Sequence, residues 1–273
     1  MIMTAEIVNE IRKRVNSNSP LVHCITNPIS INQCANAVLA VGGRPMMAEH
    51  PKEVSEITLT ANALLLNLGN ITDVRMESML ISAEAAKNHN IPCVIDAVGV
   101  ACSGHRREYA KKLIAVAKPF LIKGNYSEIN ALFDDGYSSA GVDADKAISI
   151  TEISRAAAFL AKKYNTVILA SGKTDVISDG KQVILIKNGS PQLSKITGTG
   201  CMLGTLCAVF LSEDKGINAA VTACVVMGIC GQLAETEKGN GSFFVALMDK
   251  LSVLTDSEVE NYINTETEKY EKF

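Results

Sequence analysis

The feature that most constrains the fold is a regular alternation between short apolar runs and longer segments with helical spacing. Six apolar runs have the pattern of buried strands: Leu21–Thr26, Pro45–Ala48, Ala63–Leu68, Pro92–Asp96, Phe120–Lys123 and Thr166–Ala170. The segments between them predict helices: Ser30–Val41, Lys52–Thr60, Val74–Asn88, Arg106–Ala117, Ser127–Phe133 and Glu152–Tyr164. Because intervening helices connect strands that run in parallel, the sequence predicts an α/β fold with a mostly parallel sheet covered by helices on both faces.

The pattern changes after residue 170. Thr174–Ser178 and Gln182–Lys187 predict an antiparallel hairpin, with Asp179-Gly180 supplying the positive φ angles of a tight turn. Three helices are expected next, over 197–211, Ile217–Glu235 and Phe243–Leu254, and the acidic tail after Asp256 also has helical spacing. No repeat or low-complexity linker divides the chain, so residues 1–273 are expected to form one domain.

Charge and hydropathy argue against nucleic-acid and membrane partners. The net charge is -3, and no basic block is present that would neutralise a phosphate backbone. Ile217–Ala234 carries no charge and is almost long enough to span a bilayer, but its polar and small residues favour a helix buried in the protein. The N-terminal residues have helical spacing and do not have the pattern of a signal peptide.

Eight cysteines are present, and no two of them form a C-x-x-C pair. A chain of 273 residues that is 47% hydrophobic can build a large core without disulfides. Reduced core cysteines in a cytoplasmic protein are therefore expected.

The sharpest local signal is Thr197-Gly198-Thr199-Gly200-Cys201, which opens a predicted helix. The glycines allow main-chain N–H groups to converge, and the positive end of the helix dipole points to the same place. Together they predict an anion hole for a transferring phosphoryl group. Cys201 would occupy the first helical position, where the dipole favours a thiolate, and could take the proton from a substrate alcohol. A glycine-rich helix start beside a buried cysteine has the same pattern, and the sequence alone does not separate the two interpretations.

Polar residues also follow several predicted strands. Asp96 would face the crevice at the carboxyl end of a parallel sheet and could hold Mg²⁺, but it equally suits a helix cap. Asn125 and Glu128 have capping-box spacing, although Glu128 could also organise Mg²⁺-bound water. Ser30 and Gln33 have similar spacing.

Two further signals concern a substrate pocket. Asn27 precedes a proline, which holds it outside helical geometry in a short turn that suits a ligand. Met46-Met47 follows a strand and could line an apolar pocket, although methionines are more often ordinary core residues. The four histidines lack metal-ligand spacing, and Ser171 is not in a nucleophile elbow, so hydrolase sites are not expected.

Taken in order, six motifs resemble those of the hydroxyethylthiazole kinase family of thiamine salvage: C-I-T-N-P (24–28), G-G-R-P-M-M-A (42–48), D-A-V-G-V (96–100), K-G-N-Y-S-E-I (123–129), A-S-G-K-T-D-V-I-S-D-G (170–180) and T-G-T-G-C (197–201). The resemblance covers nearly the whole chain. It implies a ribokinase-like three-layer αβα fold, ATP as co-substrate, Mg²⁺, and a homotrimer with substrate sites at subunit interfaces.

The resemblance also implies site residues. Met47 and Gly198 would contact the thiazole alcohol with Asn27 nearby, and Cys201 would stand where related kinases carry an aspartate base. The other implied contacts are Lys123 and Ser171 with ATP, and Asp96 and Glu128 with Mg²⁺.

Two positions depart from the family pattern. Lys123 stands in place of an arginine, and a lysine cannot make a bidentate phosphate contact. Ala97 stands in place of a proline, which leaves the turn after Asp96 less restricted.

Three other functions are compatible with such a sequence. They are another ribokinase-like kinase, of the hydroxymethylpyrimidine or pyridoxal type, an ATP-dependent dehydratase of nicotinamide nucleotide hydrates, and a silent sensor of thiazole or nucleotide. Cys201 in the place of an aspartate and the Thr26-Asn27-Pro28 turn favour the thiazole kinase.

Overall fold

The computed structural model describes residues 4–138 and 148–269, and in these ranges nine strands join one sheet with the order β2-β1-β3-β4-β5-β6-β7-β8-β9. The strands are β1 (Leu21–Ile25), β2 (Arg44–Met46), β3 (Ala63–Asn67), β4 (Cys93–Asp96), β5 (Leu121–Asn125), β6 (Val167–Ser171), β7 (Asp175–Ser178), β8 (Gln182–Ile186) and β9 (Thr265–Lys269). Strands β1 to β6 pair in parallel, and the last three pair antiparallel.

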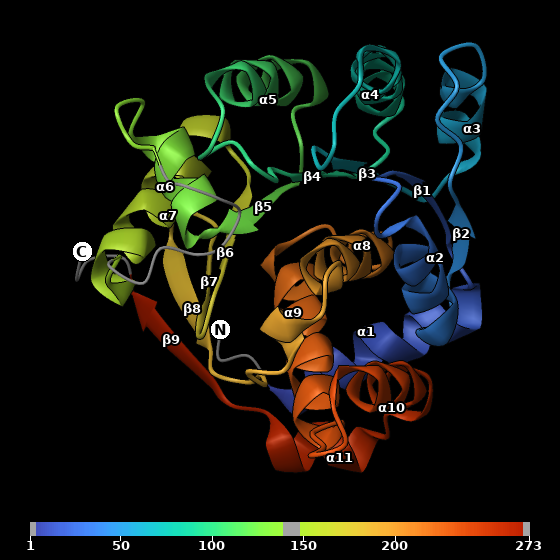
Figure 1. Ribbon diagram of the computed structural model, residues 1–273, viewed down its shortest axis with the longest axis vertical. Helices are drawn as coiled ribbons and strands as arrows, with labels where there is room; N and C mark the ends of the chain where they lie inside the picture. Colours follow the sequence, from blue (N-terminus) through green and yellow to red (C-terminus); the bar gives the residue numbers. More distant parts are fainter. Residues whose placement is uncertain (1–3, 139–147, 270–273) are drawn as a thin grey trace.

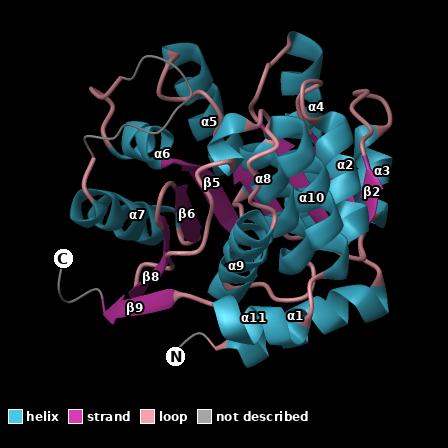
Figure 2. Cartoon of the chain, turned by 60° about the horizontal axis from the view of Figure 1, so that its bottom comes forward, coloured by secondary structure: helices cyan, strands magenta, loops and turns pink. Residues whose placement is uncertain are grey.

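Helices cover both faces of the sheet, which curves around α8 and α9 (Figure 1). One face carries α3 (Val54–Thr60), α4 (Asp73–Asn88), α5 (Gly104–Ala117), α6 (Tyr126–Phe133) and α7 (Ile150–Tyr164). The other face carries α1 (Ala5–Asn18), α2 (Ile31–Ala40), α8 (Thr199–Leu211), α9 (Ile217–Leu233), α10 (Asn240–Val253) and α11 (Asp256–Tyr262). Figure 2 shows α8, α9 and α10 stacked on this second face. The predicted three-layer αβα arrangement is confirmed.

Alternation along the strands builds a separate core on each face of the sheet. Leu65 of β3 packs into the core with α8 and α9, whereas Leu64 and Leu66 pack into the core with α4 and α5. All five β3 residues are therefore buried, as expected of a central parallel strand. The uncharged segment near residue 217 is the buried helix α9, and no helix among residues 4–138 and 148–269 is long and apolar enough to cross a membrane.

The predicted hairpin is present as β7 and β8, but its turn differs from the prediction. Gly180 alone takes a positive φ, of +83°. Asp179 contributes its side chain instead, because its carboxylate accepts hydrogen bonds from the N–H groups of Lys181 and Gln182.

Two predictions at helix ends were wrong. Ser30 precedes α2 without a side-chain cap, since Gln33 extends toward Gly198 instead of folding back; a Cβ placed on Gly198 would lie 3.3 Å from Gln33 Oε1. The tail after Asp256 is helical only to Tyr262 and then becomes strand β9, where threonine alternates with charged residues at the period of two that strands require.

Candidate active site

The site lies at the carboxyl ends of the parallel strands, where the strand order reverses. From β1 the chain passes through α2 to β2 on one side, and then returns through α3 to β3 on the other side. In open α/β sheets ligands bind at such a switch point, between the loops that follow the two strands, and we call this place the crevice. Asn27 follows β1 and Asn67 ends β3, so both asparagines stand at this crevice.

The N-terminus of α8 faces the same crevice and has no side-chain cap. Its N-cap is Gly198, with φ +96°, and its first helical hydrogen bond runs from Met202 N–H to Gly198 O at 2.8 Å. Among residues 4–138 and 148–269, none accepts a hydrogen bond from the N–H groups of Thr199, Gly200 or Cys201. These three donors and the helix dipole are the groups from which the sequence predicts an anion hole.

The thiol of Cys201 receives a hydrogen bond from Asn27, which the sequence predicts to lie in a substrate pocket. Asn27 Nδ2 donates to Cys201 Sγ at 3.3 Å, while Asn27 Oδ1 accepts from the N–H groups of Ile29 and Ser30. Cys201 is the third residue of α8 rather than the first, because Gly198 is the N-cap. This hydrogen bond fixes the position of the sulfur beside the first turn of α8.

A fully buried ion pair forms the floor of the crevice. Lys123 Nζ donates to Asp96 Oδ1 at 2.9 Å, and Asn67 Nδ2 donates to Asp96 Oδ2 at 2.9 Å. Burial raises the pKa of the Asp96 carboxyl, and contact with Lys123 offsets only part of this rise. Burial also opposes the charge on Lys123, but the Asp96 and Glu128 carboxylates outweigh this and raise the pKa of Lys123.

Glu128 is held by the main chain of two loops. Its Oε1 accepts from Gly99 N–H and its Oε2 accepts from Asn125 N–H, both at 2.7 Å. Asn125 Oδ1 in turn accepts a hydrogen bond from Glu128 N–H at 2.8 Å, which confirms the predicted capping box. Burial raises the pKa of Glu128 to about 7, although Lys123 and the two N–H donors act in the opposite direction.

These charges do not balance within the crevice floor. When ionised, Asp96 and Glu128 bring two negative charges against the single positive charge of Lys123, and all three side chains are buried. A buried surplus of negative charge favours a cation or a proton as partner.

The remaining predicted site residues come from three other elements. Met47 follows β2, is half-buried and packs against the core face that contains α8. Ser171 ends β6, and its hydroxyl donates to Gly124 O at 3.3 Å. Thr199 contributes its main chain only, because its hydroxyl donates to Leu193 O and Ile196 O.

The turn after Asp96 is restrained although Ala97 replaces a proline. Ala97 N–H donates to Lys123 O at 2.8 Å, a hydrogen bond that proline cannot make. Arg106 Nη1 donates to Leu68 O at 2.6 Å and to Val98 O at 3.2 Å, which ties the loops after β3 and β4 together.

Asn67 is the residue that the sequence analysis missed, since it had been placed inside a strand expected to run to Leu68. The signal was available: Asn67 is the one polar residue in the run Ala63–Leu68, and it stands at the carboxyl end of a parallel strand.

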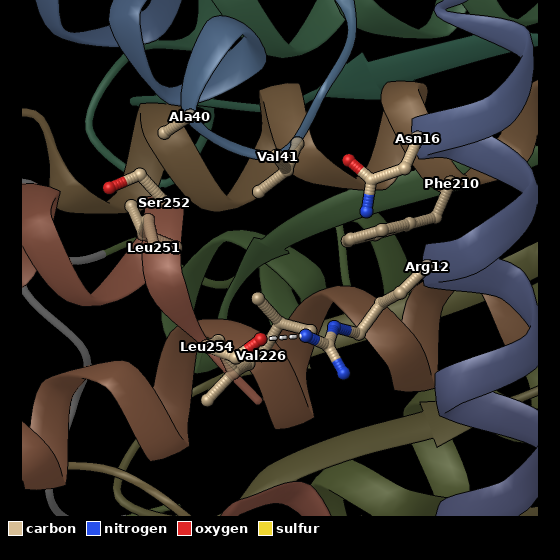
Figure 3. Close-up of a pocket in the computed structure, with 9 residues that line it drawn as sticks. All are labelled: Arg12, Asn16, Ala40, Val41, Phe210, Val226, Leu251, Ser252 and Leu254. Atoms are coloured by element: carbon tan, nitrogen blue, oxygen red, sulfur yellow. Dashed lines mark hydrogen bonds between the residues drawn. The ribbon is translucent and has the colours of Figure 1, made fainter. Parts of the chain in front are cut away.

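A small cavity elsewhere in the molecule is unrelated to this chemistry. It has a volume of about 50 Å³ and lies between α1, α8, α9 and α10 (Figure 3). Phe210, which lines it, is nine residues along α8 from Cys201, or roughly 13 Å. The cavity has room for one or two water molecules, at ~30 Å³ each, and none for a ring or a nucleotide.

Known proteins resemble this chain over most of its length. A model of the hydroxyethylthiazole kinase family matches residues 12–257. "Hydroxyethylthiazole kinase 2" of Clostridium botulinum (strain Langeland) is 46% identical over 256 residues, which cover 90% of this chain and 95% of the relative.

Solved structures of other proteins also resemble this chain over most of its length. The structure of a hydroxyethylthiazole kinase protein from Pyrococcus horikoshii OT3 has a TM-score of 0.89 and 30% identity, and covers 97% of this chain and 100% of its own. A ribokinase-like superfamily protein of Enterococcus faecalis V583 has a TM-score of 0.63 at 12% identity, with 94% of this chain and 96% of its own covered, and this likeness concerns the fold alone.

Proposed function

The chain belongs to the hydroxyethylthiazole kinase family, and from this membership we propose how its residues transfer the γ-phosphoryl group of ATP to the hydroxyl of 4-methyl-5-(2-hydroxyethyl)thiazole, a step of thiamine salvage. The observation that carries the proposal is the uncapped N-terminus of α8, with the Cys201 thiol beside it in the crevice. An alcohol oxygen attacks phosphorus, the bond to the ADP oxygen breaks, and the alcohol proton must leave.

At the acceptor end, Cys201 takes the proton of the thiazole hydroxyl. Asn27 supports this role because its amide N–H donates to Sγ at 3.3 Å and so fixes the position of the sulfur. Met47 and Gly198 would contact the thiazole alcohol. The protein around Gly198 restricts the position to glycine, since a Cβ there would stand 3.0 Å from Ser30 Cβ.

At the phosphate end, the N–H groups of residues 198–201 hold the transferring group, and Lys123 and Ser171 contact ATP. A Cβ placed on Gly200 would lie 3.9 Å from Lys123 Nζ, so the ammonium group stands close beneath the anion hole. Because phosphoryl transfer needs little covalent help from protein, positioning and electrostatics supply most of the rate enhancement.

Mg²⁺ fits this site as a partner of the nucleotide. Within residues 4–138 and 148–269, no group of three or more His, Cys, Asp or Glu side chains could hold a metal ion alone. The surplus negative charge of Asp96 and Glu128 suits an ion that keeps waters and phosphate oxygens as ligands, as Mg²⁺ usually does. Bound there, it would neutralise charge on the β- and γ-phosphates. Asp96 and Glu128 would orient its water ligands.

The assembly proposed is a homotrimer with substrate sites at subunit interfaces. Ile29 supports this arrangement, because it is apolar, 63% exposed, and only two residues from Asn27. The buried cysteines Cys24, Cys93 and Cys207 are free thiols, which suits the reducing cytoplasm.

The test is ATP consumption with hydroxyethylthiazole as sole acceptor, with and without Mg²⁺. Hydroxymethylpyrimidine and pyridoxal serve as competing acceptors, and a nicotinamide nucleotide hydrate tests the dehydratase. We expect turnover with hydroxyethylthiazole to exceed that with either competing acceptor by at least tenfold. Calorimetric binding without turnover would indicate a sensor and overturn the proposal.

A further inference from the structure

Two buried asparagines connect the acceptor end of the crevice to its charged floor. Asn27 Nδ2 donates to Asn67 Oδ1 at 3.3 Å as well as to Cys201 Sγ, and Asn67 Nδ2 donates to Asp96 Oδ2 at 2.9 Å. Both side chains are at most 5% exposed. Cys201 and Asp96 are thus joined through two amides.

The orientation of each amide is fixed by main-chain donors. Asn27 Oδ1 accepts from two N–H groups, and Asn67 Oδ1 accepts from Gly69 N–H at 2.8 Å. Each amide oxygen therefore faces a main-chain N–H group. The NH₂ group of Asn27 is directed toward Asn67 and Cys201, and that of Asn67 toward Asp96. Rotation of either amide by 180° would place donors against donors.

We infer that Asn67 is a positioning residue for phosphoryl transfer, which holds the Asp96 carboxylate with its NH₂ group and the Asn27 amide with its oxygen. The inference rests on the proposed roles of Asp96 and Cys201. The acceptor alcohol lies on the Asn27 side and the phosphates on the Asp96 side, so Asn67 keeps the two reactants at a constant separation. Such alignment contributes to turnover more than to the binding of either reactant.

Two substitutions separate the two contacts of Asn67. Asn67→Asp keeps an oxygen for Gly69 and Asn27 but replaces the donor to Asp96 with a second carboxylate. Asn67→Ser keeps a short acceptor for Gly69 N–H and is too short to reach either Asp96 or Asn27. Asn188→Asp is the control. Asn188 is also buried and uses both ends of its amide, donating to Gln232 Oε1 and Tyr262 O and accepting from Asn264 N–H.

The experiment measures kcat and both KM values, the melting temperature, and the alkylation rate of Cys201 by iodoacetamide in the nucleotide-free protein. Asn67→Asp should lower kcat by roughly 10- to 100-fold with both KM values within threefold, and leave alkylation unchanged. Asn67→Ser should lower kcat similarly and also slow alkylation about threefold or more, because Asn27 loses its partner. Asn188→Asp should lower the melting temperature only.

A kcat within twofold of the wild type for Asn67→Asp overturns the inference, as does a loss that merely follows the melting temperature. If one of the two Asn67 variants does not fold, the other tests the inference alone: a lower kcat at unchanged KM values supports it, and an unchanged kcat overturns it. Failure of the proposed function is recognised separately, because then wild-type protein does not phosphorylate hydroxyethylthiazole or Cys201→Ala retains full activity.

Discussion

Two helices begin at the same crevice and use their N-termini in opposite ways. Helix α6 starts with Asn125 as N-cap and Glu128 at the third helical position, and the two residues satisfy each other's main-chain N–H groups. Helix α8 starts with Gly198 as N-cap and Cys201 at the third helical position. Cys201 does not fold back, and the first three N–H groups of α8 have no acceptor within the described ranges.

If the proposed function holds, one kind of local structure serves stability at α6 and chemistry at α8. A capping box stabilises a helix by ~1 kcal/mol because it satisfies donors that would otherwise lose their hydrogen bonds. The α8 terminus lacks that contribution, and under the proposed function its donors bind the transferring group. Substitutions at equivalent positions should therefore change the free energy of unfolding at the α6 terminus and turnover at the α8 terminus.

The largest effect is expected for Cys201→Ala. If Cys201 accepts the alcohol proton, kcat should fall by roughly 10²- to 10⁴-fold with little change in melting temperature. The control is Cys207→Ala, which removes a thiol from the same helix but from the core. It should lower the free energy of unfolding by about 1 kcal/mol and leave kcat unchanged. Equal kcat for Cys201→Ala and wild type would falsify the assignment of the base.

Gly198→Ala should have the next largest effect. At φ +96°, with Ser30 Cβ only 3.0 Å from the added Cβ, the backbone must shift and misalign the N–H groups. We expect kcat/KM to fall by roughly 10- to 100-fold. Gly239→Ala is matched to it, because Gly239 is the N-cap of α10 at φ +110° with no atom within 4 Å of an added Cβ. Its backbone strain should be at least as large, because ψ 177° places Gly239 in a region that is essentially restricted to glycine, and it should cost no activity. Comparable losses of activity from both would mean that strain alone explains the result.

Glu128→Gln should act on the pH dependence of stability. Burial raises the pKa of Glu128 to about 7, so the native protein without metal or nucleotide retains a proton that the unfolded chain has released. Its contribution to stability is complete below the unfolded pKa, near 4.5, and is lost as pH rises to about 7. Between these values the free energy of unfolding of the wild type should decline by roughly 1–3 kcal/mol more than that of Glu128→Gln.

Glu258 provides the matched comparison, because it forms the same capping box with Thr255 at the exposed start of α11. There the Thr255 N–H and Lys250 lower the pKa of Glu258, so its contribution is present above about 4.5 and lost on acidification. Chemical denaturation as a function of pH should therefore give opposite changes for Glu128→Gln and Glu258→Gln. Changes of the same sign would show that burial does not govern the pKa of Glu128.

The two termini also show how far sequence reasoning reaches. The α6 capping box follows from spacing alone, because both partners lie within four residues and the motif is local. The same spacing at Ser30 and Gln33 predicted a box that does not form, since Gln33 faces Gly198, a residue far away in the sequence. Local motifs can be overridden in this way by tertiary contacts that spacing does not encode.

The same limit applies to the candidate site: its local patterns were predictable, and the contacts between distant segments were not. The order of strands and helices was predictable because hydrophobic periodicity is local, and family motifs indicated Asp96, Glu128 and Cys201. The link from Cys201 through Asn27 and Asn67 to Asp96 was not predictable, because its members come from four elements that only the folded sheet brings together. Strand β9 was missed for a related reason: it is stabilised by pairing with β8, about 80 residues earlier in the chain.

The smallest effect is expected for Ala97→Pro, which restores the family residue in the turn that Glu128 holds through Gly99 N–H. The substitution removes the hydrogen bond from Ala97 N–H to Lys123 O, at a cost of ~1 kcal/mol. It also restricts the unfolded chain, which stabilises the native state by ~0.4–1 kcal/mol. The two effects nearly cancel, so the free energy of unfolding in urea should change by less than ~1 kcal/mol, with kcat unchanged. A loss above ~2 kcal/mol would mean that the buried turn has no room for the pyrrolidine ring, and that the Ala97 hydrogen bond and the α6 capping box restrain the turn as one unit.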